Sequence, residues 1–174
     1  MTGGGDGHRF ARPLDGLYLA CIWTAGIAIA LMSVIIPMGV VMRYVFGFGA
    51  QWPEPIAILL MVVFTFIGAA AAYRAGGHIA VSMITDALPT PAQWVAARLA
   101  DAFMAVICAF VLWYGAKLCD ATMGQTISEL PWLPVGVTYL PIPIGAAATL
   151  LFVLERIAYG AQAARAVVRL GEIE

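Results

Sequence analysis

Charged residues are scarce in this sequence. Only 11% of its 174 residues are Asp, Glu, Lys or Arg, while 63% are hydrophobic. An ordinary soluble domain is about half apolar and about a quarter charged. A water-soluble fold of this composition would lack the polar side chains needed to cover its surface. The composition therefore predicts a single integral membrane domain, residues 1–174, because a bilayer acts as an apolar solvent.

Features that mark nucleic-acid binding and cysteine-based sites are also missing. The net charge is −1, and no basic stripe with interleaved aromatic residues occurs, so we expect no nucleic-acid partner. The three cysteines, Cys21, Cys108 and Cys119, form no CxxC pair. Neither a disulfide framework nor a zinc site is indicated.

Residues that carry chemistry inside membranes are lacking as well. The middle of each apolar stretch has no ionisable residue, and we expect the spans to bury no charge. A proton relay, an ion site or a small multidrug exporter would need such a group. A cytochrome subunit would need facing histidines, whereas the two histidines, His8 and His78, lie outside the spans. We therefore expect no enzyme activity and no catalytic, cofactor-binding or metal-binding residue in this chain.

What is present is a set of four apolar stretches, at about 17–42, 55–73, 94–118 and 139–159. Each has the roughly 20 residues that a helix needs to cross a hydrocarbon core of about 30 Å. We predict an all-α integral membrane fold with four transmembrane helices. Residues 1–13 are expected to form a flexible cytoplasmic N-terminus, and residues 160–174 a cytoplasmic tail.

The distribution of basic residues predicts the orientation of the chain. Cytoplasmic connections carry an excess of Lys and Arg. Only Arg43 and Lys117 would lie on the side opposite the termini. The remaining basic residues share the other side: Arg9, Arg12, Arg74, Arg98, Arg156, Arg165 and Arg169. We expect a multi-pass protein of the bacterial inner membrane with both termini in the cytoplasm.

The connection between the second and third spans has its own pattern. From 78 to 88, helical spacing gathers the polar residues on one face of a mostly apolar segment: His78, Ser82, Thr85 and Asp86. That arrangement is typical of a short amphipathic helix lying in the membrane interface. Leu88-Pro89 would end it, because proline restricts the residue before it.

Six residues near the span ends are candidates for subunit contact or docking: Arg43, Tyr44, Trp52, Glu54, Arg74 and His78. Simple interfacial anchoring is the alternative interpretation. Arg43 and Glu54 flank the same short connection, where they could pair. Small residues at a spacing of four also indicate helix-packing faces. These pairs are Gly26 with Ala30, Gly68 with Ala72, Ala105 with Ala109, and Gly145 with Thr149.

A series of short motifs resembles the small membrane subunit (DctQ-like) of tripartite ATP-independent periplasmic (TRAP) transporters. In order along the chain these are Arg43-Tyr44-Val45-Phe46-Gly47, Trp52 with Glu54, Phe66-Ile67-Gly68-Ala69, Arg74, His78-Ile79-Ala80-Val81, Leu88-Pro89, Tyr139 and Pro143-Ile144-Gly145. The resemblance extends from about residue 14 to 159. The chain departs from the family pattern at Pro55, Ile58 and Ser82, so ion pairs through those positions are not carried over.

The resemblance implies a scaffold rather than a carrier. In such systems a periplasmic substrate-binding protein delivers an organic acid to a large multi-helix permease subunit. That permease carries the substrate by sodium-coupled, elevator-like movement, and sodium is expected to bind there. The partners implied here are therefore the permease, the binding protein and membrane lipids, with no cofactor in this chain. The substrate is not specified, since selectivity belongs to the other subunits.

Two alternative functions remain. One is the small four-helix subunit of a tripartite tricarboxylate transporter, which is expected to lack the Arg-Tyr and Trp-x-Glu motifs. The other is a membrane anchor for an enzyme or redox complex. An anchor of that kind would need haem, metal or quinone ligands, which this sequence does not supply.

Overall fold

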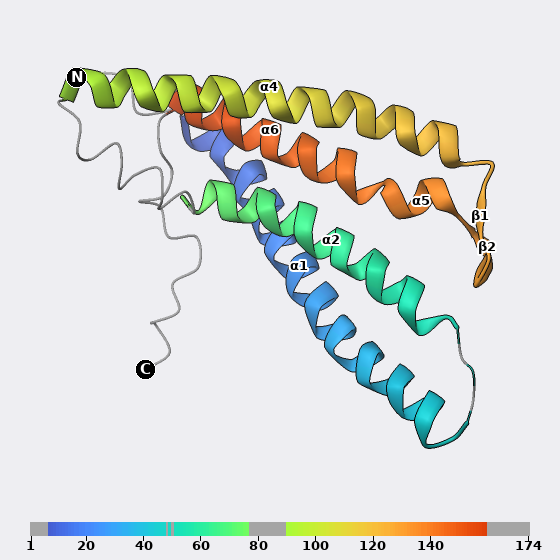
Figure 1. Ribbon diagram of the computed structural model, residues 1–174. Helices are drawn as coiled ribbons and strands as arrows, with labels where there is room; N and C mark the ends of the chain where they lie inside the picture. Colours follow the sequence, from blue (N-terminus) through green and yellow to red (C-terminus); the bar gives the residue numbers. More distant parts are fainter. Residues whose placement is uncertain (1–6, 48, 50, 77–89, 160–174) are drawn as a thin grey trace, which may run out of the picture.

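The computed structural model describes residues 7–47, 49, 51–76 and 90–159. Within these ranges the elements follow the order α1 (Gly7–Tyr44), α2 (Pro53–Arg74), α4 (Thr90–Thr122), β1 (Thr126–Ile127), β2 (Leu130–Pro134), α5 (Val135–Tyr139) and α6 (Pro141–Tyr159) (Figure 1).

The four predicted transmembrane helices are confirmed. Helices long and apolar enough to cross a membrane cover Pro13–Tyr44, Pro53–Arg74, Val95–Thr122 and Val135–Ala158. The fourth span combines α5 and α6. At 38 residues, α1 is about 57 Å long, well beyond a hydrocarbon core of about 30 Å. It must therefore tilt or project from the bilayer.

The helices lie side by side in the order α1, α2, α6, α4. Helix α2 packs against α1 on one side and against α6 on the other, and α6 packs against α4. Helix α1 contacts α6 near the end of α2 that carries Arg74. Toward its own C-terminus α1 runs away from α6 and α4 (Figure 1). We call these two ends of the molecule the Arg74 end and the Arg43 end.

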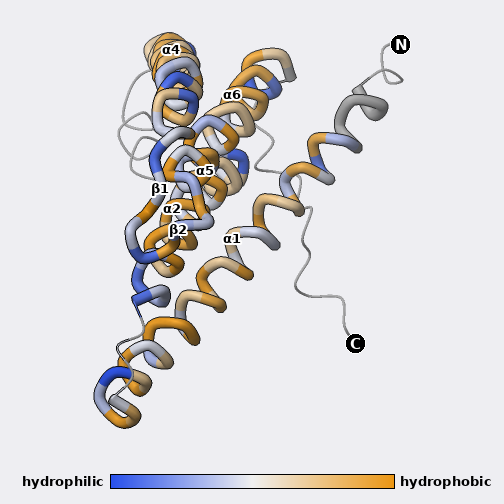
Figure 2. Tube along the Cα trace, turned by 90° about the vertical axis from the view of Figure 1, so that its right-hand side faces the viewer, coloured by the Kyte–Doolittle hydropathy of each residue, from blue (hydrophilic) through white to orange (hydrophobic). Residues whose placement is uncertain are grey.

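The buried core is small and lies where α1, α2 and α6 converge. Its fully buried side chains include Phe152 and Val153, which α6 places against Ile67 and Tyr73 of α2 and Cys21 of α1. Much of the remaining helical surface is apolar and exposed, and hydrophobic residues extend along all four helices (Figure 2). This is the surface expected of a chain whose solvent is lipid or a partner helix.

Glycines in the left-handed region end α1 and α2. Gly47, with φ 66°, follows α1, and Gly76, with φ 79°, follows α2. The amide of Gly76 donates to the carbonyl of Tyr73 at 3.1 Å, a hydrogen bond that closes the last turn. Pro53 begins α2, where its missing N–H costs no helical hydrogen bond.

A two-stranded hairpin, which the apolar pattern of the sequence does not indicate, joins α4 to α5. Strands β1 and β2 are antiparallel and pair Thr126 with Pro134 and Ile127 with Leu130, with an irregularity between the two pairs. Leu130 is buried, whereas Trp132 is exposed. The interfacial helix predicted at 78–88 and the tail at 160–174 lie outside the described residues. Of the N-terminus predicted at 1–13, residues 1–6 also lie outside them, and residues 7–13 form the first turns of α1.

The small-residue pairs differ in what they pack against. A Cβ atom at Gly145 would lie 2.7 Å from Phe66, so glycine permits the close approach of α6 to α2. At Gly68 a Cβ would meet Ala25 of α1 at 3.6 Å. At Gly26 it would meet nothing within 4 Å, and Ala30 is exposed. The Gly26 face of α1 is thus not a packing face within the described part of the chain.

Candidate functional site

The most organised polar feature is an ion cluster at the Arg74 end. The last residue of α2, Arg74, donates from Nη2 to Oδ1 of Asp15 on α1 at 2.6 Å. It also donates two hydrogen bonds to Glu155 on α6, from Nε to Oε2 at 2.8 Å and from Nη2 to Oε1 at 2.9 Å. Tyr18 and Phe152 present their rings to the guanidinium at 5.2 and 5.3 Å. A single side chain therefore ties three helices together.

A second set of contacts beside it brings in α4. Tyr73 donates its hydroxyl hydrogen to Oδ1 of Asp101 at 3.2 Å. Arg156 on α6 approaches the same oxygen with Nε, also at 3.2 Å, and lies 5.8 Å from the Tyr73 ring. Arg98 donates to the carbonyl of Ile157 at 3.1 Å, which adds another α4–α6 contact. Every one of the four spans is thus held at this end.

Three of these charges are desolvated, while Asp15 and Arg156 remain about one-third exposed. The side chains of Arg74 and Glu155 are 7% and 4% exposed, and that of Asp101 is 7% exposed. Such burial is tolerated only when each charge is paired and hydrogen-bonded. No buried side-chain nitrogen or oxygen among the described residues lacks a hydrogen-bond partner. The cluster is therefore a satisfied network that fixes the positions of the helices.

The expectation that the spans bury no charge is wrong at this end. The middle of each span holds no ionisable residue, but the charges nearer the span ends meet one another. The sequence does contain a pattern that indicates these ion pairs. Three acids, Asp15, Asp101 and Glu155, lie near the same predicted membrane side as Arg74 and Arg156. Opposite charges on apolar helices at one depth indicate ion pairs between helices.

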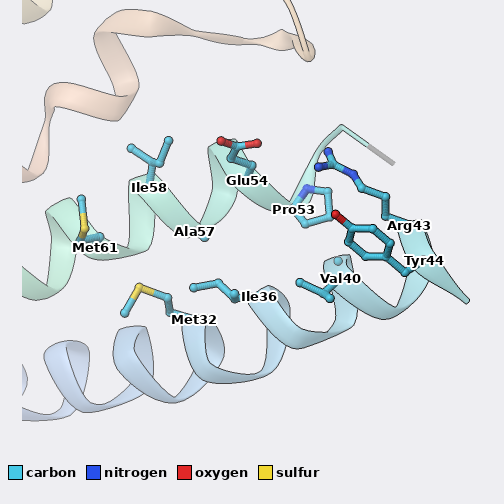
Figure 3. A pocket seen from close by; sticks show the side chains of 11 residues that line it. Met32, Ile36, Val40, Arg43, Tyr44, Pro53, Glu54, Ala57, Ile58 and Met61 are labelled. Atoms are coloured by element: carbon cyan, nitrogen blue, oxygen red, sulfur yellow. The ribbon is translucent and has the colours of Figure 1, made fainter. Parts of the chain in front are cut away.

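At the Arg43 end, three of the predicted residues line one cavity of about 390 Å³ between α1 and α2 (Figure 3). Arg43 reaches from the last turn of α1 toward Pro53, and the Tyr44 hydroxyl lies beside it. Glu54 projects from the first turn of α2. The walls are apolar: Met32, Ile36 and Val40 from α1, and Ala57, Ile58 and Met61 from α2.

The predicted residues do not form one site. Arg43 and Glu54 line the same cavity, but no ion pair joins them. Trp52 is partly buried just before α2, and Arg74 lies at the opposite end with its side chain occupied by Asp15 and Glu155. His78 lies outside the described residues. Their proposed role in docking stays a prediction.

The described ranges hold no metal ligand set, and their cysteine thiols are buried. No group of three or more His, Cys, Asp or Glu side chains there could hold a metal ion. The cysteines Cys21, Cys108 and Cys119 are buried, free and on separate parts of the helices. What the arrangement can do is pair charges between helices and present apolar surface.

Comparison with known proteins indicates the same family as the sequence motifs. The family described as tripartite ATP-independent periplasmic transporters, DctQ component, matches residues 32–163. A protein of Haemophilus influenzae named "Putative TRAP transporter small permease protein" is 29% identical over 111 residues, covering 64% of this chain and 68% of that protein. The match favours this family over the tricarboxylate transporter subunit and the enzyme anchor. The chain belongs to the DctQ component family of TRAP transporters, and is thus a multi-pass transporter subunit rather than an enzyme.

Proposed function

We propose that this chain is a rigid scaffold for a TRAP transporter. It would support the large permease subunit and help to dock a periplasmic substrate-binding protein during sodium-coupled uptake of an organic acid. The observation that carries the proposal is the ion cluster around Arg74, which joins α1, α2 and α6 with two ion pairs. If these helices moved relative to one another during transport, the contacts of Arg74 would have to break in every cycle.

The rest of the molecule supports the same role. Apolar side chains cover most of the outer helical surface, including Phe103, Val106 and Phe110 on α4 and Ile27 and Val34 on α1. A neighbouring subunit or lipid must cover them in a membrane. The midplane of each span lacks the ionisable groups that a substrate or ion site normally uses. Sodium and substrate would therefore bind the permease subunit.

A disulfide that locks α1 to α2 tests the rigidity of the scaffold. A Cβ at Gly68 would lie 3.6 Å from the Cβ of Ala25, which suits a disulfide, where the separation is about 3.5–4.5 Å. With Cys21, Cys108 and Cys119 replaced by alanine, Ala25→Cys/Gly68→Cys is oxidised in proteoliposomes that also hold the permease and binding protein. Transport should continue at the rate of the reduced form. Loss of uptake on oxidation that is reversed by a reductant would show that these helices move.

Reconstitution by component tests the assignment of transport to the partners. Proteoliposomes with this chain alone should take up no organic acid under a sodium gradient, while the permease, this chain and the binding protein together should. Sodium-driven uptake by the isolated chain would overturn the scaffold role.

Docking at the Arg43 end is tested separately. Arg43→Ala or Trp52→Ala should weaken assembly of the complex or capture of the binding protein, because both residues lie at a membrane edge that a soluble partner can reach. Pull-down of the binding protein by the membrane complex measures this. The affinity of the free binding protein for its substrate should not change. Lys117→Ala, which removes a different exposed charge, serves as the control.

A further inference from the structure

The cavity at the Arg43 end is long enough to hold part of an acyl chain. Its wall on α1 runs from Met32 to Arg43, about 16 Å at the rise of a helix, which is close to half of a hydrocarbon core of about 30 Å. Its volume of about 390 Å³ lies within the range of small-molecule sites, about 300–1,000 Å³. The cavity thus extends from a membrane edge toward the midplane, as an acyl chain does.

The lining of the cavity changes from apolar to polar along its length, as a phospholipid does from its acyl chains to its headgroup. Along the walls, Ile36, Val40, Ile58 and Met61 are each about half exposed, and they are apolar over the whole depth. At the mouth the lining becomes polar with Arg43, Tyr44 and Glu54 (Figure 3). Arginine and tyrosine are side chains that bind phosphate oxygens, and both remain exposed here.

The charge at the mouth selects among headgroups. Arg43 and Glu54 contribute one charge of each sign and form no ion pair with each other. A zwitterionic headgroup offers the complementary pair: its phosphate would meet Arg43 and Tyr44, and its ammonium would lie on the Glu54 side. An anionic headgroup would also bind Arg43 and Tyr44, but it has no ammonium group and Glu54 would repel its negative charge.

We propose that the groove between α1 and α2 binds one phospholipid with a phosphoethanolamine headgroup. Its phosphate bonds to Arg43 and Tyr44, and one acyl chain lies along Val40, Ile58 and Met61. The bound lipid fills the groove between α1 and α2 and covers its half-exposed apolar walls. This inference does not depend on the scaffold role, since the isolated chain contains the whole groove.

Native mass spectrometry of the full chain in detergent tests the site. The protein is titrated with palmitoyl-oleoyl phosphatidylethanolamine or, separately, with palmitoyl-oleoyl phosphatidylglycerol. We expect one bound phosphatidylethanolamine, with about tenfold weaker binding after Arg43→Ala, since a charge-assisted bond is lost. Ile58→Trp should block the groove to a similar extent. The matched controls are Ile107→Trp, an isoleucine of similar exposure on α4, and Lys117→Ala.

Several results would overturn the proposal. These are no retained lipid in the unchanged chain, equal retention of phosphatidylglycerol, or the same loss with Ile107→Trp as with Ile58→Trp. Release of the lipid when the purified permease subunit binds would show that a permease helix occupies the groove instead. Retention of the lipid in that complex supports the lipid site. Circular dichroism of each variant confirms that its helices are intact.

Discussion

Arg74 shows how one residue can organise a membrane protein. Its planar guanidinium has donors on Nε and Nη2, which match the two oxygens of Glu155 while a shared nitrogen also reaches Asp15. Lysine could supply the charge but not this fork. Arg74 is the last residue of α2, and its side chain lies between Asp15 of α1 and Glu155 of α6.

Removing Arg74 should leave Glu155 as a buried charge without a partner. We expect Arg74→Met to lower the free energy of unfolding by about 3–5 kcal/mol, the usual cost of breaking a buried pair. Arg74→Lys should fall between that variant and the original. Thermal unfolding in detergent measures the effect. The double variant Arg74→Met/Glu155→Met should recover much of the loss, and a single variant as stable as the original chain would contradict this role.

At the scale of the helices, the position of α6 is set by how closely it approaches α2. Gly145 faces Phe66, where an added Cβ would meet both side-chain and backbone atoms at 2.7 Å. Two residues of the same motif, Pro143 and Gly145, are buried, and Gly115 on α4 allows Pro143 to approach from the other side. The match to the family at Pro143-Ile144-Gly145 therefore has a packing explanation.

Gly145→Ala should force α6 away from α2. Overpacking of this kind costs about 1–3 kcal/mol, and we expect a lower midpoint of thermal unfolding. Gly26→Ala is the matched control, since a Cβ there meets nothing within 4 Å. It should be neutral or stabilise by about 0.5–1 kcal/mol, because alanine favours helix over glycine. Equal destabilisation by both variants would argue against a specific contact at Gly145.

The whole molecule is asymmetric between its two ends. The Arg74 end is closed by ion pairs among α1, α2, α4 and α6, whereas the Arg43 end opens where α1 diverges (Figure 1). The excess of basic residues lies on the closed side. We therefore expect the ion cluster near the cytoplasm and the opening toward the periplasm, the side on which we propose that a binding protein docks.

Cysteine labelling in intact cells tests this orientation. In a background with Cys21, Cys108 and Cys119 replaced, Gln51→Cys and Gln125→Cys should react with an impermeant maleimide. Both positions are exposed at the Arg43 end. Ala75→Cys, exposed at the other end, should react only after permeabilisation. The reverse pattern would invert the topology.

The sequence alone determined the four spans, the membrane setting and the family. Each depends on composition, run length or local motifs, because lipid accepts any apolar helix of sufficient length whatever its neighbours. The tertiary structure decided which charges meet. Arg74 lies 59 residues from Asp15 and 81 from Glu155 along the chain. Their contact depends on how each helix rotates and which helix it adjoins. Those choices are made by packing at residues such as Gly145. Its spacing marks a packing position in the sequence, but only the structure shows that it faces Phe66 of α2.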